Sequence, residues 1–206
     1  MFSNEAYLDG LAECVDRGLC RAVGVSNFNA DRLRRAHARL AERGVPLASN
    51  QIQYSLLYRA PETSGVLQAC RDLGVTPVAY SPLAQGLLTG KFGPGGGGVP
   101  SGPRRATQVG KGAKAEPVVA ALRSVGADAA ARLGLGEGAA PTPAQVALRW
   151  CCEKGTLPIP GGKNARQIRE AAGALGWRLT EEEVARLDAA SAPLGDLHPG
   201  APFEKW

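Results

Sequence analysis

Residues 156–170 read Thr-Leu-Pro-Ile-Pro-Gly-Gly-Lys-Asn-Ala-Arg-Gln-Ile-Arg-Glu, and this stretch indicates how the chain is built. A short apolar run ends in Pro-Gly-Gly, and a helical pattern opens directly after it. The free backbone N–H groups and the dipole at the start of a helix attract anions. Two cations, Lys163 and Arg166, lie in or beside this first turn, although helices favour cations in their last turn. A bound phosphate would account for both.

A purely structural interpretation of the same stretch stays open. Asn164, with Gln167 three residues later, also fits a capping box. Gly161 and Gly162 suit a tight turn without any ligand. Glycine-rich turns between a strand and a helix are weak motifs, so the rest of the chain has to decide.

Composition and charge narrow the class of protein. The chain has 206 residues, of which 44% are hydrophobic and 21% charged, as in one globular domain. The net charge of +5 is mostly dispersed, which argues against a nucleic-acid partner. The densest basic cluster falls on one predicted helix, with Arg32, Arg35 and Arg39 on one face and an apolar stripe opposite. We interpret it as a solvated helix face.

The cysteines, the length of the apolar runs and the N-terminal sequence bear on the cellular compartment. The five cysteines are an odd number without zinc or redox spacing, so we expect buried, unpaired thiols and no metal site. No apolar run reaches membrane-spanning length, and no basic region followed by an apolar core opens the chain. These features predict a soluble, cytoplasmic protein with no membrane partner.

Strand and helix patterns alternate along the chain. We expect buried strands at 20–25, 47–52 and 75–80, and a fourth in the apolar run before Gly161. Residues 93–115 are rich in glycine and predict a long flexible loop. Helices are expected at 4–18, at 30–43, from Pro61 to Leu73, from about 115 to Leu133, at 142–153, from 164, and from Thr180. This order predicts an α/β fold with a parallel sheet.

Polar residues follow all four predicted strands. They are Ser26-Asn27, Asn50-Gln51, Tyr80-Ser81 and the run from Gly161 to Lys163. In parallel α/β folds, ligand-binding groups gather where the strands end. Four polar strand ends together favour a ligand site there more strongly than any one of them does.

The motifs at these strand ends resemble the second half of an aldo-keto reductase barrel over essentially the entire chain. The matching stretches are Gly24-Val25-Ser26-Asn27-Phe28, Asn50-Gln51 with Tyr54, residues 79–91, and Pro158-Ile159-Pro160-Gly161 with Gln167 and Glu170. The chain is most similar to a plant and algal branch of that superfamily. The resemblance implies a partial (β/α)8 TIM barrel, made of about four C-terminal strand–helix units plus extra helices.

The resemblance also implies that the cofactor is NADP. Ser26, Asn27 and Gln51 would hydrogen-bond the nicotinamide carboxamide, and Tyr80 would stack on the nicotinamide ring. Lys163 and Arg166 would hold the adenosine 2′-phosphate. At position 171, where the family usually has Asn, this chain has Ala, so one adenine contact is expected to be lost. The pyrophosphate would be lined by Ser81, Leu83, Gln85 and Gly86, and Lys91 would be a phosphate cation. The 2′-phosphate and the adenine would be reached by Gln167 and Glu170, and Gly161 is a further implied cofactor contact.

The family's catalytic Asp, Tyr, Lys and His come from the first half of the barrel, and none of them can be matched here. We therefore expect no catalytic residue in this chain, and we expect an incomplete gene product or one half of a split protein. The implied activity is NADP(H)-dependent reduction of a small carbonyl substrate, performed together with a missing N-terminal half. An inactive fragment and a non-catalytic, nucleotide-binding regulatory subunit are the alternatives. The plant and algal resemblance adds the chloroplast as a compartment, should a transit peptide precede Met1.

Overall fold

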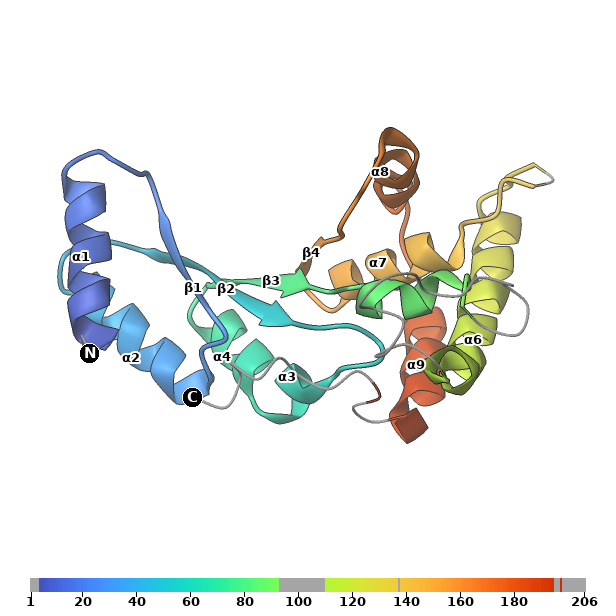
Figure 1. Ribbon diagram of the computed structural model, residues 1–206, viewed down its shortest axis with the longest axis horizontal. Helices are drawn as coiled ribbons and strands as arrows, with labels where there is room; N and C mark the ends of the chain where they lie inside the picture. Colours follow the sequence, from blue (N-terminus) through green and yellow to red (C-terminus); the bar gives the residue numbers. More distant parts are fainter. Residues whose placement is uncertain (1–3, 93–109, 137, 195–196, 198–206) are drawn as a thin grey trace. The chain divides into compact units, whose positions relative to one another are not determined.

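A computed structural model describes residues 4–92, 110–136, 138–194 and 197. Its four strands form one sheet in the order β1-β2-β3-β4, which is also their order along the chain. Strands β1 (Val23–Ser26) and β2 (Leu47–Gln53) pair in parallel, with Ser26 opposite Gln51. Strands β3 (Thr76–Tyr80) and β4 (Leu157–Ile159) follow (Figure 1). The alternation of strands with helices predicted from the sequence is confirmed.

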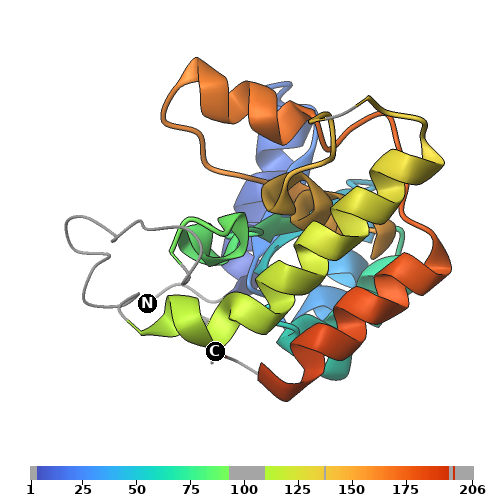
Figure 2. The ribbon, with the colours of Figure 1, turned by 90° about the vertical axis from the view of Figure 1, so that its right-hand side faces the viewer.

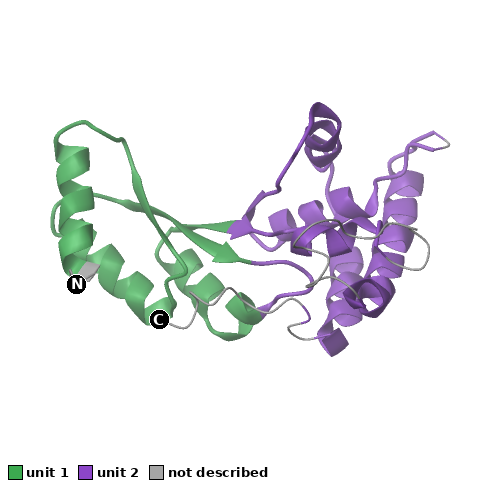
Figure 3. Ribbon diagram, viewed as in Figure 1, with its two compact units in different colours: residues 1–53, 60–78, 200–206 green, residues 54–59, 79–199 purple. Residues whose placement is uncertain are grey.

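The chain divides into two compact units, which are coloured separately in Figure 3. Unit 1 comprises residues 1–53, 60–78 and 200–206, and unit 2 comprises residues 54–59 and 79–199. Unit 1 contains the helices α1 (Asn4–Asp16), α2 (Ala30–Ala41), α3 (Ala60–Thr63) and α4 (Val66–Asp72). Unit 2 contains η1 (Ala84–Thr89), α6 (Lys111–Arg132), α7 (Pro143–Glu153), α8 (Ala165–Ala172), α9 (Glu181–Ser191) and η2 (Ala192–Leu194).

In unit 1, α2 packs on α1, α4 and β2. Asn29 caps this helix by accepting a hydrogen bond from the Arg32 backbone, and the buried face is formed by Leu33, Ala36 and Leu40. Both features follow the sequence pattern. The first strand begins three residues later than predicted, because residues 19–22 lie largely in solvent and do not enter the sheet. The helix expected from Pro61 is two short helices, separated at Gly65, whose φ of +78° ends helical geometry.

In unit 2, α6 contacts α7, α9 and η1, and Figure 2 shows α6 and α9 running side by side. Helices α7 and α9 both open with capping boxes, formed by Thr142 with Gln145 and by Thr180 with Glu183, as their sequences predicted. Helix α6 begins at Lys111, so the last residues of the predicted loop 93–115 are helical. Gly112 and Ala115 are buried, and this packing extends the helix into the glycine-rich segment. Residues 93–109 of that loop lie outside the described residues.

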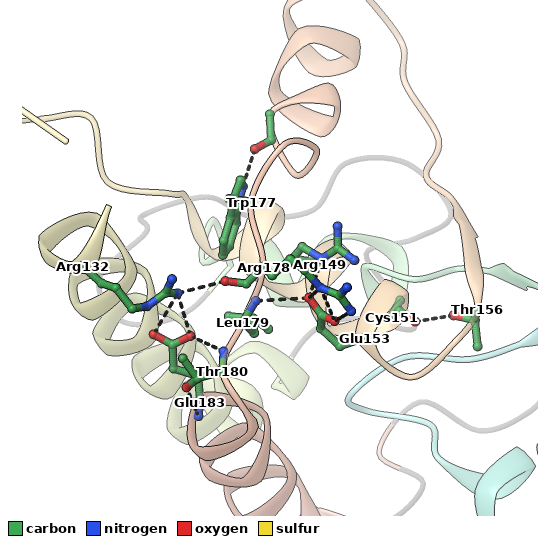
Figure 4. Close-up of polar contacts among 11 residues, drawn as sticks. Arg132, Arg149, Cys151, Glu153, Thr156, Trp177, Arg178, Leu179, Thr180 and Glu183 are labelled. Atoms are coloured by element: carbon green, nitrogen blue, oxygen red, sulfur yellow. Dashed lines mark hydrogen bonds and ion pairs between the residues drawn. The ribbon is translucent and has the colours of Figure 1, made fainter. Parts of the chain in front are cut away.

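The segment between α8 and α9 is held by two carboxylates, those of the half-buried Glu153 and the buried Glu183 (Figure 4). Glu153 on α7 pairs with Arg178 at 2.7 Å and accepts a hydrogen bond from the Leu179 backbone. Glu183 on α9 pairs with Arg132 of α6 at 3.0 Å. Burial alone would raise the pKa of Glu153, but the hydrogen bonds from Arg178 and Leu179, together with the charge of Arg149, hold this pKa below its ordinary value of 4.5.

We expect Glu153→Gln to remove part of the pH dependence of stability. Because the folded-state pKa of Glu153 is depressed, its contribution is present above pH 4.5 and is lost as the pH falls through the folded-state value. The free energy of unfolding of the variant should therefore be lower at pH 7 and should approach that of the original chain near pH 3. Urea titrations at several pH values measure this difference. Glu13→Gln, in an exposed pair with Arg17, is the control, and an equal effect of the two substitutions would contradict the prediction.

Candidate functional site

The turn after β1 is the best-defined part of the predicted site in unit 1. The Ser26 hydroxyl and the Asn27 backbone N–H both donate to the Gln51 carbonyl oxygen, at 3.0 and 2.9 Å. A Cβ at Gly24 would lie 2.3 Å from the Ser49 hydroxyl oxygen and 3.1 Å from the Ser49 carbonyl oxygen, so a larger residue would require Ser49 to move. The structure thus brings Ser26, Asn27 and Gln51 together, and their contacts with a nicotinamide stay a prediction.

Asn27 carries two local signs of a binding residue. Its φ is +57°, a left-handed conformation that is uncommon outside glycine and is enriched at functional sites. Its Oδ1 atom is buried and accepts no hydrogen bond from the described residues. A buried oxygen without a partner costs free energy. An amide N–H of a ligand, such as that of a nicotinamide carboxamide, would supply the missing donor.

Asn50, which was not among the predicted cofactor contacts, supports the turn after β1. It is fully buried in β2, accepts a hydrogen bond from the Phe28 backbone N–H at 3.3 Å and donates to the Phe28 carbonyl at 2.9 Å. Asn50 therefore fixes the far side of the Ser26–Phe28 turn. An amide inside an otherwise apolar strand was the signal in the sequence.

In unit 2, β3 ends in a turn with unusual backbone geometry. Ser81, Ala84, Gln85 and Gly86 all have positive φ, between 47° and 99°. Hydrogen bonds from Ala84 N to Ser81 O and from Gly86 N to Leu83 O, both 2.8 Å, hold the turn. Ala84, Gln85 and Gly86 are consecutive, and the N–H groups of Ala84 and Gly86 are used within the turn, so a contact of this turn with phosphate stays a prediction. Tyr80 and Leu83 here are half-buried, and Lys91 is exposed.

The glycine-rich stretch between β4 and α8 leaves its two cations unpaired. Lys163 and Arg166 are exposed, and neither side chain makes an ion pair or hydrogen bond with the described part of the chain. Asn164 caps α8 by accepting from the Gln167 backbone, and the Gln167 side chain accepts from the Lys163 backbone at 2.8 Å. The capping interpretation is therefore correct for Asn164, and it leaves both cations available.

Two predicted adenine contacts are engaged within the protein. The side chain of Gln167 holds the Lys163 backbone, and a Glu170 carboxylate oxygen accepts a hydrogen bond from Thr142 at 3.3 Å. Gly161 lies exposed just before this turn. The contacts of Gln167 and Glu170 with adenine remain predictions.

The described residues contain no cluster of three or more potential metal ligands. All five cysteines are unpaired, as predicted, although Cys14, Cys20 and Cys152 are half-buried rather than buried. Burial raises the pKa of Cys70 to about 11, so this thiol is a poor nucleophile.

His37 is half-buried on α2, and His198 lies outside the described residues. No described helix has both the length and the apolar character needed to cross a membrane.

A parallel sheet built from strand–helix units, with polar turns at its strand ends, is typical of α/β proteins that bind ligands where the strands end. A model of the aldo/keto reductase family matches residues 2–192, and the chain belongs to this family. It is 41% identical over 185 residues to the chloroplastic pyridoxal reductase of Arabidopsis thaliana, covering 89% of this chain and 47% of that protein. It is 31% identical to the aldo-keto reductase yakc [NADP(+)] of Schizosaccharomyces pombe, covering 90% of this chain and 52% of that one.

Among solved structures, the glycerol dehydrogenase AKR11B4 of Gluconobacter oxydans superposes with a TM-score of 0.72 at 25% identity. The match covers 96% of this chain and 57% of the dehydrogenase. The structural neighbours are (β/α)8 barrels, and the present chain has the fold of part of such a barrel, as predicted. It spans about half the length of the curated relatives it matches.

Proposed function

We propose that this chain is the NADP(H)-binding half of an enzyme that reduces carbonyl groups to alcohols. The observation that carries the proposal is the Asn27 Oδ1, which has no hydrogen-bond partner among the described residues and lies in a turn fixed by Gln51 and Asn50. When bound, the nicotinamide supplies the hydride for the reduction. The role of this chain is to orient the carboxamide through Ser26, Asn27 and Gln51, which selects the face of the nicotinamide ring that is presented to the substrate.

The remaining predicted contacts extend the same proposal. Tyr80 would provide a flat surface for the nicotinamide ring. The turn formed by Ser81, Leu83, Gln85 and Gly86, with Lys91, would hold the pyrophosphate. The charges of Lys163 and Arg166, which pair with no residue in the described ranges, suit the additional phosphate that distinguishes NADP from NAD. The name of the fission yeast relative, which includes NADP(+), supports this choice of cofactor.

The proposal includes a partner and a compartment. We propose that the substrate site and the proton donor come from a further polypeptide segment, equivalent to the first half of the longer relatives. Apolar residues in unit 2 support this: Leu157 and Ile159 on β4 and Ile168 on α8 are 41–55% exposed. We propose the cytoplasm as the compartment, with the chloroplast as the alternative that the Arabidopsis relative's name supports.

Cofactor preference tests the proposal. We expect the chain to bind NADPH more tightly than NADH, and we expect the double variant Lys163→Ala/Arg166→Ala to lose at least about tenfold in NADPH affinity with little change for NADH. Isothermal titration calorimetry with both cofactors measures the two affinities.

Arg169→Ala is the matched control for this experiment. Arg169 is equally exposed and lies on the same helix, but in its last turn. An unchanged NADPH-to-NADH ratio in the double variant would contradict the role of the two cations. Absence of any binding of NADPH or NADH by the original chain would contradict the proposed function itself.

A further inference from the structure

Helix α8 carries residues proposed to bind the adenosine end of the cofactor, yet it has little packing of its own. None of its residues, Ala165–Ala172, is buried, and it packs against α7. Because burial contributes little to holding α8, polar contacts with α7 have a large share in fixing its position. These contacts come from two residues at the start of α7, Thr142 and Gln145.

The Gln145 side chain uses both ends of its amide. Its Oε1 accepts a hydrogen bond from the Thr142 backbone N–H at 2.8 Å, which is part of the capping box of α7. Its Nε2 donates to the Glu170 carbonyl oxygen, in the last turn of α8, at 3.0 Å. The Thr142 hydroxyl adds a second link by donating to the Glu170 carboxylate at 3.3 Å. One side chain therefore caps α7 and also joins it to α8.

The other capping box of unit 2 indicates that capping alone does not require glutamine. Helix α9 opens with Thr180 and Glu183, and the Glu183 carboxylate accepts from the Thr180 backbone N–H at 2.8 Å. Glutamate and glutamine both serve as acceptors in such a box. Only glutamine also has an N–H to donate, and at position 145 this donor meets a carbonyl oxygen of α8. The residue type at position 145 thus suits the link between the two helices.

Gly173, directly after α8, leaves the space that this link occupies. A Cβ at Gly173 would lie 2.1 Å from Gln145 Nε2 and 3.1 Å from Gln145 Cδ. Gly173 has a φ of −67°, so its backbone conformation does not require glycine. The close approach of the Gln145 amide is what leaves no room for a side chain at this position.

We propose that Gln145 is a positioning residue for the NADP 2′-phosphate, because it fixes the helix that carries Lys163 and Arg166 at its start. Helix α8 has eight residues, about two turns, so holding its last turn also places its first. This inference rests on the proposed function, although Gln145 itself is not among the predicted cofactor contacts. If α8 occupies its binding position for a smaller fraction of the time, the apparent affinity falls by the same factor.

Two substitutions remove the link in different ways. Gln145→Glu keeps an acceptor for the cap of α7 but places a carboxylate against the Glu170 carbonyl oxygen. Gly173→Ala displaces the Gln145 amide, although alanine favours helical structure more than glycine does. We expect each to lower the NADPH affinity about fivefold and to leave the NADH affinity, which involves no 2′-phosphate, within about twofold. Isothermal titration calorimetry of the full chain measures both cofactors.

Glu183→Gln is the matched control, because it makes the reverse exchange in the capping box of α9. It also weakens the pair between Glu183 and Arg132, so it controls for a general loss of stability. The NADPH affinity of this variant should stay within about twofold of the original. Amide hydrogen exchange in residues 165–172 should become faster in Gln145→Glu and Gly173→Ala but not in the control.

The inference is overturned if Gly173→Ala or a folded Gln145→Glu variant keeps the NADPH affinity of the original chain, or if Glu183→Gln loses as much. It is also overturned if NADH affinity falls by the same factor as NADPH affinity, because Gln145 would then have no specific effect on the 2′-phosphate. Failure of the original chain to bind either cofactor would instead contradict the proposed function, and with it the effect of Gln145 on affinity.

Discussion

Purified alone and supplied with NADPH, this chain is expected to leave aldehydes and ketones unreduced. Hydride transfer to a carbonyl builds negative charge on the oxygen, and this charge must be met by a proton or a strong donor. A positioned general acid contributes roughly 10²–10⁴ in rate, and preorganised hydrogen-bond donors add a factor of about 10²–10³. Without both, the rate should match that of the reaction without protein.

The four tyrosines of the chain are poor candidates for the missing acid. Tyr54 is fully buried and stacks on Trp150, with ring centroids 5.1 Å apart. Tyr7 is 63% exposed on α1 and is not among the predicted cofactor contacts. Tyr58 lies in a short turn with Ser55 and is not among the predicted cofactor contacts. Tyr80, at the end of β3, is the one whose proposed position lies against the nicotinamide.

The measurement is the loss of NADPH absorbance with 4-nitrobenzaldehyde, a reactive substrate, for the original chain and for Tyr80→Phe. Turnover clearly above the protein-free rate would reveal an acid within this chain. If Tyr80→Phe then abolished the turnover, Tyr80 would be that acid, and the stacking role proposed for it would be incorrect. Calorimetric NADPH binding by both proteins serves as the control for a folded cofactor site.

Local signals in the sequence predicted the elements well because they act over a few residues. The caps at Asn29, Thr142 and Thr180 were all recognisable, since each needs only a side chain and a backbone N–H three residues later. The four polar strand ends were recognisable for the same reason. The buried face of α2 followed from its apolar period alone.

Features that depend on distant contacts could not be predicted. The role of Asn50 requires the Phe28 turn, which is 22 residues away in the sequence. The early start of α6 depends on packing that buries Gly112, a residue with weak helix propensity. The positive φ values at Ser81, Ala84 and Gln85 are set by the turn as a whole, because none of these residues favours that conformation by itself.

The contacts of Asp188 on α9 are the clearest example of such unpredicted features. It accepts a hydrogen bond from the Trp150 indole at 2.9 Å and pairs with Lys154 at 2.7 Å and with Arg59 at 3.3 Å. Lys154 and Arg59 also lie 5.5 and 5.7 Å from the centre of the Trp150 ring. Trp150 is thus the side chain on which this cluster of unit 2 is assembled.

Trp150→Ala should therefore cause a large loss of stability, about 3–5 kcal/mol in the free energy of unfolding. The substitution removes a fully buried ring, its stack on Tyr54 and the indole N–H that Asp188 accepts. Trp150→Phe, which keeps most of the apolar contact but not the N–H, should cost less, about 1–3 kcal/mol. Urea unfolding followed by circular dichroism measures both values.

Trp177→Ala is the matched control for this experiment. Trp177 is half-buried, and its indole donates to the Gly173 carbonyl within the same short segment. Because that contact is local and the ring is partly in water, the loss should be about 1 kcal/mol. Equal losses from the two tryptophans would show that the Asp188 cluster does not organise unit 2. A loss for Trp150→Phe as large as that for Trp150→Ala would instead assign most of the effect to the single hydrogen bond between the indole and Asp188.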